Sequence, residues 1–408
     1  MKRRWTNMVV ATILATTILI IQALPAAAQP KPFKIGYIGG LTGPLAFQAQ
    51  PALAGTKYAI EEANKAGGFQ GSQVELVVKD GKERPDVSLS EARSLVMNDG
   101  VTILLGGASA PVVMALSAFA KERKIIYIPY PSGTMVWGKE GHRYVFKLNG
   151  NADNFGYATA EYLAEKPFKN YYTIASDHLF GHDTINYAWK RLAEKKPDVK
   201  KVGEFWPKFG ERDYVNYITS IMAAKPDAVL ALLSGSNAID FIRQAKNVGF
   251  FKNIRLANTL LITTDVVAMG KEMPDGIIGT SEYDLDYCTE KFPLARKVQQ
   301  RYDQDYKDKN YANVVTGYNS TLFLVSAVKK AGSADVEKII DALEGLEIDT
   351  ALGKMKCLPH SHRAIPPMFV GVTKMTPQYP FATITDLKVY QADKIMLSED
   401  EVRKMRGQ

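Results

Sequence analysis

Small polar residues follow an apolar run at 101–111, VTILLGGASAP, in a spacing that suits anion binding. The first five residues have the composition of a strand buried on both faces of a parallel sheet, and two glycines end it. Ser109 stands at the expected N-cap of the next helix, with Pro111 in its first turn. Such a turn directs backbone N–H groups, a hydroxyl and the positive end of the helix dipole toward one point. The segment therefore predicts half of a site for a carboxylate or phosphate, although any strand-to-helix crossover also needs a tight polar turn.

Other motifs with catalytic potential are incomplete. A dinucleotide-binding enzyme needs G-x-G-x-x-G after its first strand, and IGGLTGPL at 38–45 does not provide it. A serine hydrolase needs G-x-S-x-G around Ser109, where the sequence has GASAP. His178 and His182 are four residues apart, as in some zinc sites, but no third ligand is evident, so we interpret them as solvated or capping residues. His360 and His362 flank a loop and are interpreted in the same way. We expect no enzymatic activity, no cofactor and no metal.

Strands and helices alternate along most of the chain. Strands are predicted near 34–40, 74–80, 101–105 and 124–130, with helices between them. After a connecting strand at 145–150 the alternation restarts and continues to about 283, before three consecutive helices and two late strands. This order predicts two α/β halves with parallel sheets and right-handed crossovers. The polar segment 396–408 is expected to be a mobile tail.

The N-terminus has the features of an export signal. Residues 1–28 combine a basic start, an apolar stretch and three alanines at a cleavage position. No cysteine stands at the cleavage point after the apolar stretch to carry acyl chains, so we expect a soluble exported protein without a lipid anchor. The net charge of +8 falls to about +5 without this segment, and no run of basic residues favours nucleic acid as a partner.

Together, the export signal, the TGP loop, the GGASAP turn, the PSGT turn and the two α/β halves resemble the leucine-binding type of periplasmic solute-binding protein. Such a protein is the receptor of an ABC importer for hydrophobic amino acids and related acids. The resemblance covers residues 33–395 and implies a type I periplasmic-binding-protein fold, in which three crossing strands join two lobes that close on the ligand.

The resemblance also implies where the lobes divide. Lobe one comprises 33–149 plus 284–353, and lobe two comprises 150–280 plus 356–395. The crossings then lie near Leu148 to Asn151, Thr280 to Asp284 and Leu352 to Met355.

Carried over residue by residue, the resemblance assigns a ligand site. The carboxylate-binding serine falls on Ser109, and a second turn with backbone amides and a hydroxyl falls on Ser132 and Thr134. The covering aromatic falls on Phe180, and the acidic partner of a ligand ammonium falls on Thr259, which is not acidic. Three further residues are expected in the wall of the site: Phe47, Asn237 and Tyr283.

The absence of an acid at Thr259 leaves an α-ammonium partly unpaired in a closed site, which is costly. We therefore expect a small, largely apolar carboxylic acid without an α-amine, aromatic in preference. A hydrophobic amino acid stays open as an alternative, with Asp265 as the nearest carboxylate. A ligand-sensing domain and an exported hydrolase are further alternatives.

Two other expectations concern covalent and protein partners. Cys288 and Cys357 are predicted to form one disulfide, because the compartment is oxidising and both follow predicted crossings. We expect a monomer that delivers its ligand to an ABC permease and ATPase at the inner membrane.

Overall fold

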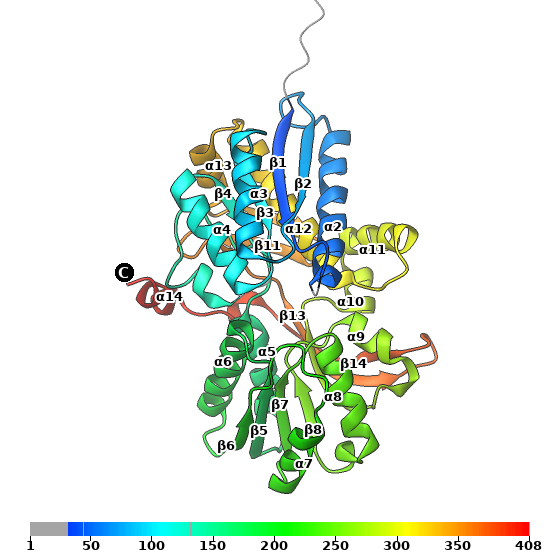
Figure 1. The fold of residues 1–408 in the computed structure, drawn as a ribbon. Coiled ribbons are helices and arrows are strands. Elements are labelled where there is room, and N and C mark those ends of the chain that lie inside the picture. Colours follow the sequence, from blue (N-terminus) through cyan, green and yellow to red (C-terminus); the bar gives the residue numbers. More distant parts are fainter. Residues whose placement is uncertain (1–31, 44, 131–132, 408) are drawn as a thin grey trace, which may run out of the picture.

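A computed structural model describes residues 32–43, 45–130 and 133–407. The predicted export signal and the predicted site residue Ser132 lie outside these ranges. The described chain forms two lobes, one above the other in Figure 1, and each lobe has a sheet with helices packed against it. This architecture confirms the predicted α/β fold class. Within the described ranges no helix is long and apolar enough to span a membrane.

Lobe one is built around a parallel sheet in the order β2-β1-β3-β4. Its strands are β1 (Phe33–Gly39), β2 (Val74–Asp80), β3 (Ile103–Gly106) and β4 (Ile126–Ile128). The helices from the first part of the chain are α2 (Ala46–Lys65), α3 (Pro85–Met97) and α4 (Ala110–Arg123), followed by a short 3₁₀ helix at Thr134–Val136. A later segment adds α10 (Leu285–Lys291), α11 (Pro293–Asp305), α12 (Tyr311–Ala331), α13 (Val336–Leu343) and a small sheet of β10 (Glu347–Thr350), β11 (Gly353–Leu358) and β12 (Arg363–Ala364).

Lobe two has a seven-stranded sheet in the order β14-β13-β9-β8-β7-β5-β6. The strands from β9 to β6 run parallel, and β13 is antiparallel to both of its neighbours. The strands are β5 (Asn170–Ala175), β6 (Lys200–Phe205), β7 (Ala228–Leu232), β8 (Arg255–Asn258), β9 (Ile278–Ser281), β13 (Met368–Met375) and β14 (Ala382–Tyr390). The helices are α5 (Ala152–Ala164), α6 (Leu179–Lys195), α7 (Val215–Ala224), α8 (Ser236–Asn247) and α9 (Thr263–Met269), with short 3₁₀ turns at Phe250–Lys252, Gly270–Glu272 and Ala392–Lys394.

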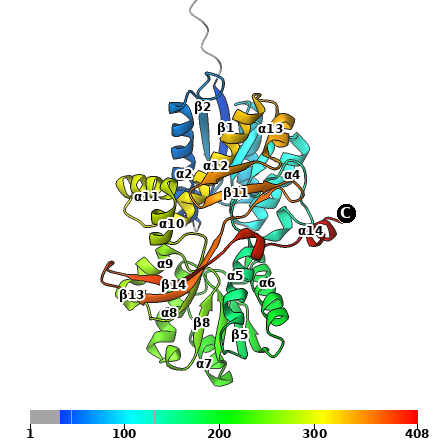
Figure 2. The same cartoon turned by 180° about the vertical axis from the view of Figure 1, so that it is seen from behind.

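The chain passes between the lobes three times, and the third crossing differs from the expected one. The first two lie at 145–151 and 281–285, whereas the third lies at 365–367, between β12 and β13 (Figure 2). The segment expected to cross at 352–355 folds back instead, because β10 and β11 form an antiparallel hairpin. Gly353 supports this tight turn with a positive φ of 87°. Residues 356–364 therefore belong to lobe one.

Helices α2 and α12 approach each other closely through glycines. A Cβ on Gly55 would lie 1.9 Å from the carbonyl oxygen of Val314, and a Cβ on Gly317 would lie 1.9 Å from that of Ala52. Neither position admits a side chain, so both glycines are required for this contact. The packing fixes the start of α2, which carries Phe47, against the lobe-one core.

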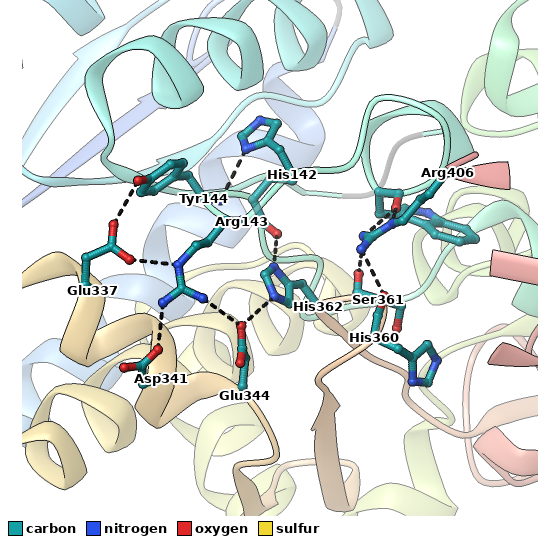
Figure 3. Close-up of polar contacts among 12 residues, drawn as sticks. His142, Arg143, Tyr144, Glu337, Asp341, Glu344, His360, Ser361, His362 and Arg406 are labelled. Atoms are coloured by element: carbon teal, nitrogen blue, oxygen red, sulfur yellow. Dashed lines mark hydrogen bonds and ion pairs between the residues drawn. The ribbon is translucent and has the colours of Figure 1, made fainter. Parts of the chain in front are cut away.

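The C-terminal segment is folded, in contrast to the mobile tail that we expected. Helix α14 (Glu399–Met405) begins with a capping box in which Ser398 and Glu401 bond each other's backbone N–H groups. The guanidinium of Arg406 donates to the carbonyl oxygens of Trp137, His360 and Ser361 in lobe one (Figure 3). On the other side, Asn154 and Arg191 of lobe two donate to the carbonyls of residues 395 and 394. The segment thus contacts both lobes beside the crossings.

The neighbouring histidines were only partly anticipated. His362 is buried rather than solvated: its ring stacks on Phe146 with centroids 4.2 Å apart, and its Nε2 lies 3.0 Å from the Glu344 carboxylate. Burial lowers the pKa of His362. Figure 3 shows Arg143 beside it, bonded to three carboxylates of α13 and its C-terminal end. This polar cluster ties the first crossing to the later segment of lobe one.

Candidate functional site

A cavity of about 680 Å³ lies between the two lobes. A volume of this size accommodates a small organic molecule. Most of its wall is apolar and includes four phenylalanines, contributed by both lobes: Phe47, Phe155, Phe180 and Phe209. The polar wall residues are Gln48, Ser109, His178, Ser234, Ser236, Asn237, Glu282 and Asn313. The arrangement suits a ligand with an aromatic or aliphatic body and few polar groups.

Four of the predicted site residues line this cavity: Phe47, Ser109, Phe180 and Asn237. Phe47 of lobe one reaches lobe two, where a Cβ on Gly235 would lie 3.7 Å from its ring. Phe180 packs edge-on against Phe155 with ring centroids 6.1 Å apart. The amide of Asn237 donates to the Tyr214 hydroxyl at 2.9 Å, which fixes its orientation in the wall.

The turn before α4 has the predicted geometry, but its N–H groups are already engaged. Ser109 is the N-cap residue in extended conformation, and its hydroxyl makes no cap hydrogen bond. The backbone N–H groups of Ala108 and Ser109 both donate to Oε1 of Glu83, at 2.9 and 2.5 Å. A carboxylate does bind at this helix start, as the physics of the turn predicts, but it comes from the protein itself.

Glu83 reaches this position through an unusual backbone. Both Lys82 and Glu83 have positive φ, 52° and 51°, in the left-handed region that non-glycine residues avoid. Each such residue costs of order 1–3 kcal/mol and persists only where the surrounding structure imposes it. Glu83 was not predicted as a site residue, because nothing in the segment GKERP indicates a left-handed pair that turns one acidic side chain inward.

The second predicted turn also contacts a carboxylate of the protein. The backbone N–H and the hydroxyl of Thr134 both donate to Oδ2 of Asp183, each at 2.9 Å. Thr134 belongs to lobe one and Asp183 to α6 of lobe two, so the contact bridges the cleft. Gly133 lines the cavity, whereas Thr134 does not.

Two predicted residues lie away from the cavity. Thr259 is fully buried in lobe two; its N–H donates to the carbonyl of Ala231, and its hydroxyl has no hydrogen-bond partner. Tyr283 points into lobe one, where its hydroxyl donates to Gln299 at 2.7 Å. Neither residue is part of the wall.

Glu282, next to Tyr283, is a wall residue that the sequence analysis missed. It lies on the second crossing, and its carboxylate accepts from the Gly150 N–H at 3.1 Å and the Thr316 hydroxyl at 2.8 Å. Burial raises its pKa, and the nearby Lys147 ammonium opposes that shift. Glu282 supplies the acidic group that was absent at Thr259.

A second buried acid supports the lobe-two wall. The Asp265 carboxyl accepts from the N–H groups of Gly235 and Ile262, at 3.1 and 3.3 Å, and both of these residues line the cavity. Burial raises the pKa of Asp265 to about 7, although these two hydrogen bonds favour its charged form. Its protonation state therefore bears on the shape of the wall near neutral pH.

His178 was predicted as a solvated or capping residue and is in fact the N-cap of α6. Its Nδ1 accepts from the Gly181 N–H at 3.0 Å, so in the neutral ring Nε2 carries the proton. Burial lowers the pKa of His178, which favours this neutral form. Since His178 also lines the cavity, it is a hydrogen-bond donor available at the lobe-two side.

The predicted disulfide is absent. Cys288 on α10 and Cys357 on β11 are separate free thiols, each fully buried in the apolar core of lobe one. Burial raises the pKa of both thiols. They act as small apolar core residues rather than as a crosslink. Among the residues described, no group of histidine, cysteine and acidic side chains is arranged to hold a metal ion.

Comparison with known proteins identifies the family. Residues 32–376 match the periplasmic binding protein family. The chain belongs to this family. A leucine-, isoleucine-, valine-, threonine- and alanine-binding protein of Pseudomonas aeruginosa is 25% identical over 328 residues, which cover 79% of this chain and 84% of that protein.

Solved structures share the fold over nearly their whole length. An ABC-type branched-chain amino acid transporter protein of Rhodopseudomonas palustris has a TM-score of 0.77 and 24% identity, covering 90% of this chain and 98% of that one. A solute-binding protein of an ABC transporter from the same species, in complex with 3,4-dihydroxybenzoic acid, has a TM-score of 0.78 and 20% identity, covering 88% and 98%. These structures confirm the predicted type I periplasmic-binding-protein fold.

Proposed function

We propose that this protein captures a small acid with an aromatic or other apolar body between its lobes and delivers it to an ABC permease and ATPase at the inner membrane. It acts as a monomeric receptor, not as an enzyme, in the periplasm after cleavage of residues 1–28 and without a lipid anchor. The observation that carries this proposal is the cavity between the lobes, with four phenylalanines in its wall.

The aromatic body is supported by the chemistry of the wall. Burial of an apolar ligand surface contributes about 25 cal/mol per Å², so a ring enclosed by phenylalanines gains several kcal/mol from burial alone. The related structure from R. palustris that binds 3,4-dihydroxybenzoic acid shows that this fold accommodates such a ligand. On the lobe-two side, a carboxylate could accept hydrogen bonds from polar groups at and just before the start of α8 and from Nε2 of His178. The residues at α8 are Ser234, Ser236 and Asn237.

A hydrophobic amino acid is the second candidate, and Glu282 favours it. An α-ammonium in the cavity would face this buried carboxylate, which removes the objection based on Thr259. The P. aeruginosa relative is named for amino acids of this kind.

Calorimetry with benzoate, 4-hydroxybenzoate, leucine and phenylalanine separates the two candidates. We expect micromolar or tighter binding of an aromatic acid and at least tenfold weaker binding of leucine. Binding of leucine or phenylalanine without binding of either acid would replace the first candidate with the second.

A further inference from the structure

The start of α4 presents two backbone N–H groups that could bind an anion, and Glu83 occupies this position. Two backbone N–H groups converge on Oε1 of this residue at 2.9 and 2.5 Å. An external carboxylate at the same point would need either to displace Glu83 or to lie against its negative charge. Among the described residues of the cavity wall, Glu282 is the only acidic one, and none is a lysine or arginine that would offset the repulsion.

The second oxygen of Glu83 is buried without a hydrogen-bond partner. It lies beside Gly40, where a Cβ would come within 3.0 Å of it, so the glycine leaves the space that this oxygen fills. An unpaired carboxylate oxygen at a buried position is costly, and a hydrogen-bond donor placed beside it would recover much of that cost.

The space next to Glu83 limits what that donor can be. A void of about 10 Å³ has Glu83, Tyr130 and Thr316 in its wall, and it shares three wall residues with the large cavity: Gln48, Ala108 and Asn313. A void of this size holds about one water molecule. One hydroxyl oxygen fits there, whereas a carboxylate does not.

We propose that Glu83 is a specificity-determining residue that accepts a hydrogen bond from a hydroxyl group at one end of the ligand and excludes a carboxylate from that end. The inference rests on the proposed function, because it assumes an aromatic acid as the ligand. An acid then binds with its hydroxyl toward lobe one and its carboxylate toward the polar groups of lobe two. The ligand class becomes hydroxylated aromatic acids.

Calorimetry of the full-length mature protein with 4-hydroxybenzoate and benzoate tests the proposal. The wild-type protein should prefer 4-hydroxybenzoate by roughly 10- to 150-fold, the value of one hydrogen bond to a charged group. Glu83→Ala should reduce this ratio to near 1, because it removes the acceptor and frees the two N–H groups for benzoate. Glu83→Gln keeps an uncharged acceptor and should give an intermediate ratio. Glu122→Ala, at a side chain 70% exposed on α4, is the control and should keep the wild-type ratio.

The outcomes separate this proposal from the proposed function. Equal binding of both acids by the wild-type protein, or an unchanged ratio in Glu83→Ala, would overturn the role of Glu83 while the acid-binding function stands. If neither acid binds the wild-type protein, hydroxylated aromatic acids are not its ligands. Benzoate binding by the Glu83→Ala variant then decides the role of Glu83. Gain of benzoate binding in folded Glu83→Ala then supports the exclusion of carboxylates, and no gain overturns it.

Discussion

The contact between Thr134 and Asp183 should stabilise the closed arrangement of the lobes. Opening of the cleft separates α6 from the turn after β4 and transfers both groups to water. The two bonds to one carboxylate oxygen, each 2.9 Å long, are partly buried. A hydrogen bond to a charged group contributes about 1.5–3 kcal/mol, and partial exposure places the pair near the lower end. Asp183→Ala should therefore shift the equilibrium toward the open form by roughly tenfold or more.

Small-angle X-ray scattering without ligand and calorimetry with ligand measure this shift. The variant should have a larger radius of gyration and a dissociation constant raised by about the same factor as the loss of closed population. Asp177→Asn is a matched control, because Asp177 lies just before α6 and its side chain bonds His182 within lobe two. If Asp183→Ala scatters like the wild-type protein and binds ligand equally well, the contact does not hold the lobes together.

Three further predictions follow from the wall and the core. Phe180→Ala should weaken binding of an aromatic acid by roughly tenfold or more through lost apolar contact, as calorimetry would show; unchanged affinity would remove Phe180 from the ligand contact. Burial raises the pKa of Asp265 from 3.8 to about 7, so the folded protein binds this proton more tightly than the unfolded chain does. The free energy of unfolding should therefore fall as the pH rises from about 4 to 7. Urea titrations should show this fall, by at most about 4 kcal/mol, and Asp265→Asn should abolish it; an equal slope in the variant would contradict the assignment. Finally, Cys288 and Cys357 should react with a thiol reagent in guanidinium without reductant and stay unreactive in the native protein. If neither reacts after denaturation, the two cysteines form the disulfide that the sequence predicted.

The alternation of strands and helices was sufficient to predict the fold, because apolar runs and glycine-rich turns are local signals. The hairpin of β10 and β11 was missed, since a strand that crosses between lobes and one that turns back have similar composition. Helix α14 was missed because its anchor, Arg406, makes its contacts with distant carbonyl groups that no local pattern reveals.

Side-chain direction limited the prediction of the site. Ser109 and Phe180 follow strand ends whose geometry the fold fixes, and both reach the cavity. On the second crossing the chain bends at Glu282, which lines the cavity, whereas the hydroxyl of the next residue, Tyr283, donates to Gln299 in lobe one. The prediction therefore placed the aromatic Tyr283 in the wall, whereas the wall residue is the acid one position earlier, Glu282. Glu83 depends on left-handed backbone at a non-glycine residue, which sequence patterns do not indicate.

The folded C-terminal segment has a practical consequence for labelling. Its hydrogen bonds reach lobe two near residues 394 and 395 and lobe one through Arg406, so this segment is held at the junction of the two lobes. A fluorophore attached there would sense rotation directly, and its emission would report ligand capture. The same attachment to residue 202 on β6, at the far side of lobe two, would move rigidly with that lobe and remain silent.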